Sequence, residues 1–596
     1  VVLFHAGAPL FSGGFVGVDI FFVISGYLIT TIILAELEVG TFSIVNFYER
    51  RARRILPALF LAVGVCLPFA WLWLMPSDVR EFAKSVMAVL GFAANIFFWQ
   101  HSDYFDAATE LKPLLHIWSL GVEEQFYLFF PIVLMAAWRL GRKWIVGLLV
   151  IGSLLSLALS QYGAGVRPVA TFFLLPTRGW ELAMGSLIAF YLNDTVRDNA
   201  RAHFPPALAQ MLSLAGLGLI IYSIVAFDKE TPFPSLYALV PTMGAALIIL
   251  FALPGTFVGM LLGGKVPVAI GLVSYSAYLW HQPLFAFARH RSLTEPTGFV
   301  IASLVVCTFV LAYGTWRYIE TPFRQKGVVS KLLLWRSVVT GAVVIASFAA
   351  GLQMTAGEFQ NKIHHDAEKL YRVNTCLFEV DQMYDTLLES HCDQPAASSA
   401  QEDSGQSRTS KRYVLYGDSI AAHLYPGLIT RIPERDIIQL TGGGCPAIRS
   451  SIDSPRCRDF YDWFTGEYVP NNPVDAILIS SSWKAVYERL GDRNFRVKLD
   501  DLFERLQGKR VVVYSMAASL KVDIPRYYYK LERFGYEVPA NLEMEADDLS
   551  AVNSALREEV AKFGFECIDI SQQFCSVGMC MVAKDGVLYF SDARHL

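Results

Sequence analysis

The sequence predicts a multi-spanning α-helical membrane bundle followed by an α/β domain built on a parallel sheet. Hydrophobic residues make up 54% of the 596 residues and charged residues only 17%, with a mean hydropathy of +0.39. This is too apolar for an ordinary soluble protein. The apolar excess stops near Met354. After Tyr413 short apolar runs alternate with helical patterns, as they do in parallel sheets covered by helices on both faces.

Long apolar runs fill the first 354 residues and predict the membrane helices. A bilayer span needs about 20 apolar residues. The first run is too short for this, so we expect that the chain starts inside its first helix. The runs lie near residues 1–11, 16–36, 58–75, 82–100, 120–137, 144–160, 170–192, 207–227, 236–253, 267–287, 297–316 and 334–353.

Basic loops predict the sidedness of these helices, because cytoplasmic loops are enriched in Lys and Arg. Further basic clusters follow the runs that end at 137 and 316. All clusters lie on one side only if one earlier run does not cross, and the acid-flanked run at 82–100 is the best candidate for a surface or re-entrant helix. About eleven crossings remain, and this odd number places the C-terminal part outside the cytoplasm. The first basic cluster consists of Arg50, Arg51, Arg53 and Arg54.

Seven of the nine cysteines follow the last apolar run, which favours an oxidising compartment with disulfides and one leftover thiol. No two of them have the CxxC spacing of a zinc site, and we expect no metal. Cys66 and Cys307 lie in apolar runs and are expected to be buried packing residues. Spacing leaves the connectivity open. Nearest-neighbour pairing would join Cys376 to Cys392, Cys445 to Cys457, and Cys575 to Cys580.

Composition also predicts the domain boundaries. We expect a membrane domain at 1–325, an additional membrane helix at 326–354, a linker with a small extension at 355–411, and the α/β domain at 412–596. Within the last domain, β-rich apolar runs predict strands and longer amphipathic patterns predict helices. The predicted strands are 413–416, 437–440, 476–479 and 511–515, and the predicted helices include 499–506 and 549–563.

A catalytic serine is predicted where the first of these strands ends. Gly417-Asp418-Ser419 follows the strand, and Asp592 and His595 stand near the end of the chain. Open α/β sheets place their sites at the carboxyl ends of strands. His595 would act as the base for the Ser419 hydroxyl, and Asp592 would hold the imidazole tautomer. Each piece alone is more often a turn or a helix cap, so it is their combination that favours catalysis.

These residues make the last domain resemble the SGNH (GDSL-like) family. The resemblance implies that Ser419 is the nucleophile and that Asp592 and His595 complete a triad. It also implies that a backbone N–H of Gly443 or Gly444 stabilises an oxyanion. The family usually carries Gly-x-Asn-Asp after a later strand, whereas this chain has Ser480-Ser481-Ser482-Trp483 there. An oxyanion donor is therefore missing from its usual place, and Trp483 is either a core or a substrate-stacking aromatic.

Charged and polar residues inside apolar runs are costly and tend to be functional. For His5 a functional role is predicted, because a neutral imidazole can act as a base on a thioester or hydroxyl. Arg178 and Glu181 form an i,i+3 pair, which serves function or only internal ion pairing. The Arg50–Arg54 cluster is either a topology signal or a binding site for the phosphates of a nucleotide cofactor. The other polar residues of this kind are Asp19, Glu123, Glu124 and His281.

Residues 1–325 resemble the membrane acyltransferase-3 family. The family pattern also has an Arg about eleven residues before the His, and this chain starts too late to show it. The matching pieces, in family order, are Leu3-Phe4-His5, Gly17-Val18-Asp19 through Gly26, Tyr48 through Pro57, Ser119 through Tyr127, and Trp316 through Pro322.

Together the two resemblances imply a bacterial inner-membrane O-acetyltransferase. Acetyl-CoA would be the donor, a cell-surface glycan such as lipopolysaccharide O-antigen the acceptor, and the C-terminal domain periplasmic. The net charge of −4 argues against a nucleic-acid partner. The alternatives are an O-acetyltransferase of peptidoglycan or exopolysaccharide, a glycan acetyl-esterase with a membrane anchor, and an acyl or glycan transporter. The sugar and the oligomeric state stay open.

Overall fold

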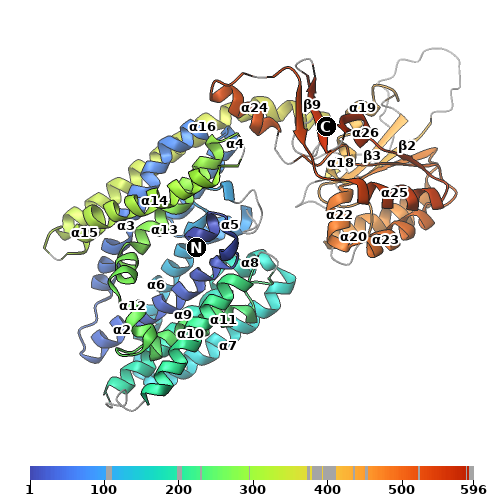
Figure 1. The fold of residues 1–596 in the computed structure, drawn as a ribbon. Helices are drawn as coiled ribbons and strands as arrows, with labels where there is room; N and C mark the ends of the chain where they lie inside the picture. The colour runs from blue at the N-terminus through green and yellow to red at the C-terminus, as the bar shows by residue number, and fades with distance from the viewer. Residues whose placement is uncertain are drawn as a thin grey trace. The chain divides into compact units, whose positions relative to one another are not determined.

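The protein folds as two compact units, residues Val1–Phe359 and Gln360–Leu596, in a computed structural model (Figure 1). The residues that the structure describes are 1–101, 110–197, 205–228, 231–293, 295–325, 327–371, 376–378, 392, 411–433, 436–449, 454–520, 524–537, 539–576, 578–584 and 587–589.

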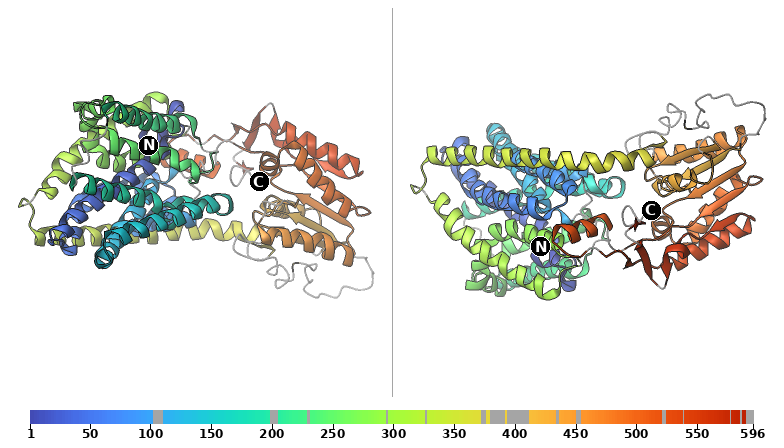
Figure 2. Two further views of the ribbon diagram at one scale, coloured as in Figure 1. Left: turned by 90° about the horizontal axis from the view of Figure 1, so that it is seen from below. Right: turned by 90° about the horizontal axis from the view of Figure 1, so that it is seen from above.

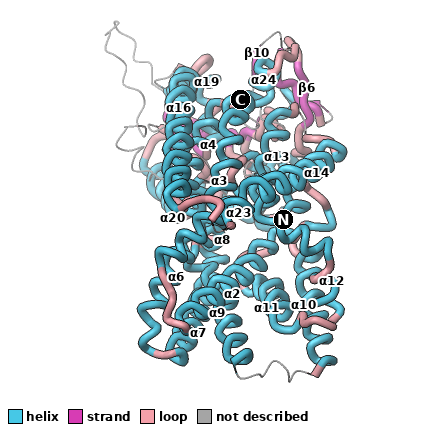
Figure 3. Tube along the Cα trace, turned by 90° about the vertical axis from the view of Figure 1, so that its left-hand side faces the viewer, coloured by secondary structure: helices cyan, strands magenta, loops and turns pink. Residues whose placement is uncertain are grey.

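Helices make up the first unit, and the strands of the described chain all belong to the second (Figure 3). A short 3-10 helix, Leu115–Ile117, precedes α6, and a π-helical turn, Trp316–Glu320, follows α14. The helices are α1 (Val2–His5), α2 (Gly17–Glu38), α3 (Ile44–Trp73), α4 (Pro76–Leu90), α5 (Ala94–His101), α6 (Trp118–Ala137), α7 (Arg142–Val166), α8 (Pro168–Phe173), α9 (Leu175–Arg197), α10 (Pro206–Ala226), α11 (Leu239–Phe251), α12 (Phe257–Leu262), α13 (Lys265–Arg291), α14 (Gly298–Thr315), α15 (Thr321–Arg324) and α16 (Lys331–Tyr371).

Seven helical segments in the described part of the chain are long and apolar enough to cross a membrane, which makes this a multi-pass membrane protein. The expected count of eleven is not confirmed. Helices α9 and α13 have 23 and 27 residues but interrupt their apolar surface with charged or polar side chains. The run at 82–100 falls into α4 and α5, whose 15 and 8 residues are too few for a span. The seven segments are Gly14–Glu38, Ile44–Trp73, Leu115–Leu140, Arg142–Val166, Pro206–Ala226, Gly298–Arg324 and Lys331–Thr355.

Two glycines allow α2 and α9 to cross at close range. A Cβ atom on Gly26 would lie 1.9 Å from the carbonyl oxygen of Leu182, and one on Gly185 would lie 2.0 Å from that of Val23. Small residues at such crossings let membrane helices pack backbone to backbone. This contact places the N-terminal halves of α2 and α9, with their charged residues, side by side inside the helical bundle.

The long helix α16 lies alongside α3 on the outside of the bundle (Figure 2). Its residues Ile345, Ala349 and Leu352 are buried in the same hydrophobic cluster as the core of α3. A Cβ on Gly341 would stand 3.0 Å from the Phe60 ring, so the two helices pack closely there.

The predicted basic clusters gather at one end of the first unit. Arg50 pairs with Glu36 near the end of α2 at 2.8 Å, and Arg142 pairs with Glu38 at 2.9 Å. Arg53 donates to the carbonyl oxygen of Val329, at 2.8 Å, in the segment before α16. Loops that are far apart in sequence therefore meet on the same side, as the positive-inside pattern requires.

A six-stranded, wholly parallel sheet in the order β1-β3-β2-β4-β5-β7 forms the centre of the second unit. Alternate residues of β2 enter separate hydrophobic clusters, with Val414 and Tyr416 in one and Leu415 in the other. Both faces of the sheet are therefore covered, as predicted. The strands are β1 (Leu377–Phe378), β2 (Tyr413–Gly417), β3 (Ile437–Gly442), β4 (Ala476–Ser480), β5 (Val511–Tyr514) and β7 (Glu566–Ile568).

The four strands expected from apolar runs are confirmed as β2, β3, β4 and β5, and the two expected helices as α23 and α25. A small antiparallel sheet was not predicted, because its strands are short and partly polar. It consists of β6 (Leu542–Glu545), β8 (Cys575–Ser576), β9 (Met579–Lys584) and β10 (Val587–Leu588). The helices are α18 (Ser419–Ala422), α19 (Tyr425–Leu428), α20 (Pro455–Trp463), α21 (Val469–Asn471), α22 (Trp483–Leu490), α23 (Asp492–Arg505), α24 (Ile524–Arg533), α25 (Ser550–Lys562) and α26 (Ser571–Phe574).

The nearest-neighbour disulfides are confirmed, which leaves Cys567 as the odd thiol of the second unit. In the first unit Cys66 is buried as expected, but Cys307 is only half-buried because it lies on an outward part of α14. The three disulfides are Cys376–Cys392, Cys445–Cys457 and Cys575–Cys580.

Candidate functional site

Ser419 lies at the carboxyl end of the central strand β2, as predicted. The chain leaves β2 toward β3 on one side, whereas it leaves β4 toward β5 on the other. The two connections diverge between β2 and β4, and open α/β sheets bind ligands in the crevice at such a switch point. Ser419 is the first residue of α18, and the preceding Asp418 caps this helix by accepting the N–H of Ile420 at 2.9 Å.

The second oxygen of Asp418 holds the loop that follows β4. It accepts the hydroxyls of Ser481 and Ser482, both at 2.7 Å, and the backbone N–H of Ser482 at 2.8 Å. The side chain of Asp418 is buried. A buried carboxylate needs such hydrogen bonds to offset its loss of water. The residue before the serine therefore joins the two loops that flank the switch point.

The two proposed oxyanion donors, Gly443 and Gly444, both lie in the glycine loop after β3, but they differ in how available their backbone N–H groups are. The N–H of Gly443 donates to the carbonyl oxygen of Phe378 at 2.7 Å, so this structure commits that donor to strand β1. Gly444 is exposed and has a positive φ of 67°. Arg456 donates to the carbonyl oxygen of Gly443 at 2.8 Å, and the neighbouring disulfide Cys445–Cys457 tethers the same loop. Gly444 is thus the better placed of the two glycines.

The other two members of the predicted triad, Asp592 and His595, lie outside the described residues. Their roles stay predictions. In the sequence, the described part of the chain ends shortly before them, at Tyr589 after β10.

Trp483 is a core residue rather than a stacking platform. Its side chain is fully buried, and its indole N–H donates to the carbonyl oxygen of Tyr514 at 2.8 Å. The indole therefore links the end of β4 to the end of β5.

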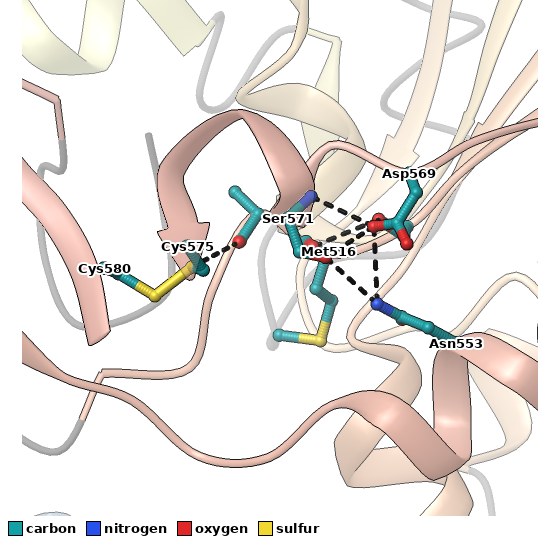
Figure 4. Close-up of a disulfide and its surroundings, with 8 residues drawn as sticks. Met516, Asn553, Asp569, Ser571, Cys575 and Cys580 are labelled. Atoms are coloured by element: carbon teal, nitrogen blue, oxygen red, sulfur yellow. Dashed lines mark hydrogen bonds between the residues drawn. A yellow bond between two sulfur atoms is a disulfide. The ribbon is translucent and has the colours of Figure 1, made fainter. Parts of the chain in front are cut away.

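Asp569, which sequence reasoning missed, follows β7 and bonds to Ser515, which follows β5. Figure 4 shows it beside Ser571 and Asn553. It accepts the hydroxyls of Ser515 at 2.9 Å and Ser571 at 2.5 Å, beside the disulfide Cys575–Cys580. Burial opposes its ionisation, but the hydrogen bonds from Ser571 and Ser515 outweigh burial and hold the pKa of Asp569 below its ordinary value. An Asp directly after a β-run was the signal that could have identified it.

In the first unit, the predicted pair of Arg178 and Glu181 is confirmed at 3.0 Å, and Asp19 joins it from α2 at 2.9 Å. All three side chains are at most 1% exposed. Four aromatic rings surround the guanidinium at 5.5 to 5.6 Å: those of Phe22, Trp118, Phe172 and Phe233. These contacts fit a structural clamp between α2 and α9.

Three buried histidines meet elsewhere in the bundle. The ring of His281 lies 5.3 Å from that of His5 and 5.1 Å from that of His116, centroid to centroid. Its Nδ1 lies 2.7 Å from the carbonyl oxygen of Tyr278. A carbonyl only accepts, so Nδ1 carries the proton, and Nε2 of the neutral ring is a proton acceptor. His116 was missed because it precedes the apolar run that begins at residue 120.

Glu123 and Glu124 take different positions on α6. Glu123 is buried and accepts the hydroxyls of Ser25 and Tyr127. Glu124 is half-buried. Both carboxylates interact electrostatically with Arg51, so α6 is connected to the basic cluster of α3.

That basic cluster lines a cavity of about 610 Å³ together with Arg324 and Lys331. Arg50 and Arg53 are held in ion pairs with Glu36 and Glu49. Among the residues described, Arg51 and Arg54 form no such pair within 4 Å, and the Nε of Arg51 is buried without a hydrogen-bond acceptor. A cavity with such donors suits a phosphate-bearing ligand. The lining residues are Asn46, Glu49, Arg50, Arg51, Arg53, Arg54, Arg324, Gly327, Val329, Ser330 and Lys331.

Comparison with known proteins bears out both resemblances. Residues 1–317 match the family described as "Acyltransferase domain", and residues 376–596 match "SGNH domain (fused to AT3 domains)". The O-acetyltransferase OatA of Staphylococcus aureus (strain NCTC 8325 / PS 47) is 28% identical over 382 residues, which cover 62% of this chain and 63% of OatA. The candidate O-acetyltransferase SAR0937 of Staphylococcus aureus (strain MRSA252) is 26% identical over 456 residues, which cover 73% of this chain and 74% of that one.

One solved structure is also similar, the periplasmic domain of a Salmonella ser. Paratyphi A lipopolysaccharide acetyltransferase. It is 16% identical, covers 39% of this chain and 89% of its own, and has a TM-score of 0.31. The acyltransferase match spans more than half of the chain and coincides with the helical first unit. The protein is therefore an enzyme that belongs to the membrane acyltransferase family, with an SGNH domain fused to it.

Proposed function

We propose that the protein moves an acetyl group from cytoplasmic acetyl-CoA to a sugar hydroxyl of a cell-surface glycan outside the cytoplasmic membrane. The observation that carries the proposal is the union of a membrane acyltransferase unit and an SGNH unit in one chain, with Ser419 at the switch point of its sheet. In net terms the thioester C–S bond breaks and an ester C–O bond forms. The proton of the sugar hydroxyl ends on the thiol of CoA.

Two stations would share the transfer. The basic cavity at the Arg50–Arg54 cluster would hold the phosphates of CoA, and the bundle, with His5 participating, would pass the acetyl group on. Ser419 would then carry it as an ester, with His595 as base and Asp592 as orienting carboxylate. The basic clusters support a cytoplasmic position for the cavity, and three disulfides support a periplasmic second unit.

The acceptor is proposed among cell-surface glycans because related proteins are named O-acetyltransferases. Among these glycans, the sugars of lipopolysaccharide O-antigen are the first to test, since the fusion of the two domains most resembles proteins that modify them.

Ser419→Ala tests the relay most directly. Removing the nucleophile should lower acetylation of surface glycans by about 10³-fold or more, because a triad without its nucleophile loses nearly all of its rate. The measurement is mass analysis of glycans from cells that carry the wild type, the variant or no protein. Equal amounts of protein in the membrane are the control, and wild-type acetylation with Ser419→Ala would refute the relay.

The donor site makes a separate prediction. Arg51→Gln with Arg54→Gln should raise the KM for acetyl-CoA about tenfold or more, because each charge-assisted bond to a phosphate contributes roughly 1.5–3 kcal/mol. Arg139 is an exposed arginine of another basic loop, and Arg139→Gln is the matched control. Initial rates in membranes over a range of acetyl-CoA concentrations provide the comparison. Equal KM values for both variants would exclude this cavity as the donor site.

A further inference from the structure

The serine run at the end of β4, residues 480–482, contributes no free hydroxyl to the site around Ser419. Ser480 donates to the carbonyl oxygen of Tyr514 at 3.4 Å, and Ser481 and Ser482 both donate to Asp418. A hydroxyl has a single proton to donate. The backbone N–H of Ser482 is committed to Asp418 as well. The strand end where the family resemblance places an Asn donor therefore serves another purpose.

The hydroxyl of Ser481 holds neighbouring loops together. It donates to Asp418 at 2.7 Å and at the same time accepts the backbone N–H of Ala447 at 3.3 Å. Ala447 lies in the glycine loop after β3, three residues beyond Gly444. One fully buried hydroxyl thus connects the loop after β4 to the loops after β2 and β3.

We infer that Ser481 is a positioning residue of the acyl-transfer centre. Acting through Asp418, it fixes the distance between the loop of Ser419 and the loop of Gly444, and the oxyanion donors of this enzyme are the backbone N–H groups of those two loops. The inference rests on the proposed role of Ser419 as nucleophile. Oxyanion donors act only when they lie about 2.7–3.1 Å from the position of the developing charge, which leaves a tolerance of only a few tenths of an ångström. A buried link that sets their separation therefore acts on the transition state more than on substrate binding.

The test measures hydrolysis of p-nitrophenyl acetate by the full chain in detergent, with Ser419→Ala as the blank. Ser481→Ala should lower kcat about 10- to 100-fold while KM stays within twofold, and Ser481→Thr, which keeps the hydroxyl, should recover part of kcat. Ser480→Ala is the matched control. It removes a buried hydroxyl from the same strand end without touching either loop, and its kcat should stay within twofold of wild type.

A second readout is independent of how much protein folds. The rate constant for labelling of Ser419 by a fluorophosphonate probe reports only on intact sites, and Ser481→Ala should lower it at least tenfold. Unchanged kcat and labelling in Ser481→Ala, or an equal loss in Ser480→Ala, would overturn the inference. Full activity in Ser419→Ala would instead overturn the proposed function, so the two failures are distinguishable.

Discussion

Replacing Arg178 by Met should strongly destabilise the membrane unit. Arg178 is the one cation of the triad that it forms with Asp19 and Glu181, at 2.9 and 3.0 Å. Its loss leaves two buried carboxylates facing each other without a counter-charge. Breaking a buried pair in this way costs about 3–5 kcal/mol, a large fraction of the roughly 5–15 kcal/mol that stabilises a typical protein. Fluorescence-detected gel filtration of detergent extracts during heating measures the effect.

Two further variants isolate the charge as the cause. Arg142 pairs with Glu38, but their side chains are 22% and 33% exposed. Arg142→Met should therefore cost only about 0–1 kcal/mol. Adding Asp19→Asn and Glu181→Gln to Arg178→Met removes the uncompensated charges and should restore part of the lost thermal stability. A melting temperature of Arg178→Met equal to that of wild type would contradict the structural role of the ion pairs among Asp19, Arg178 and Glu181.

Replacing Gly417 by Ala should unfold the second unit. A Cβ at this position would lie 1.8 Å from the carbonyl oxygen of Ser480 and 3.0 Å from the Cβ of Ala421. The residue also has a φ of 145°, where a side chain is strained. Relief requires β2 and β4 to separate, at a cost of about 4 kcal/mol or more. Limited proteolysis in membranes should remove the second unit of the variant while the first stays protected, and fluorophosphonate labelling of Ser419 should disappear.

Two glycines of the same unit serve as controls. Gly491 has a positive φ of 74°, but a Cβ added there would meet nothing within 4 Å, so Gly491→Ala should cost only the backbone strain, about 1–2 kcal/mol. Gly466 lies in a helical turn with open space around it, and Gly466→Ala should be near neutral. If Gly417→Ala resisted protease as well as Gly466→Ala does, the close approach of β2 and β4 would be wrong.

The strands were predictable because their signals are local, whereas the disulfides follow nearest-neighbour pairing, one of the connectivities that spacing left open. Short β-rich runs such as 437–440 and 476–479 mark buried parallel strands, which need no partner to be recognised. Disulfides between cysteines 16, 12 and 5 residues apart join neighbours along the chain. The antiparallel strand β6 was not predicted because it is only four residues long and Glu543 and Glu545 interrupt its apolar pattern.

The number of membrane-spanning helices was harder to predict, because charged residues inside a helix weaken its local hydropathy signal. Helix α9 carries Arg178 and Glu181 in its first turns, so hydropathy alone underrates it, and only its contact with Asp19 explains how such charges stay buried. His116 was missed because a histidine outside an apolar run gives no local signal. Its proximity to His281 arises from packing between the 3-10 helix before α6 and helix α13.

By itself the sequence determined the two-part architecture, the membrane character, the acyltransferase and SGNH families, and the strand that leads to Ser419. These depend on hydropathy, periodicity and motif order, which are properties of short stretches. Tertiary structure alone decided which groups meet: Asp19 with Arg178 across 159 residues, and Asp418 with Ser481 across 63. Buried charges and hydroxyls must find partners wherever the fold supplies them, and those partners lie far away in the chain.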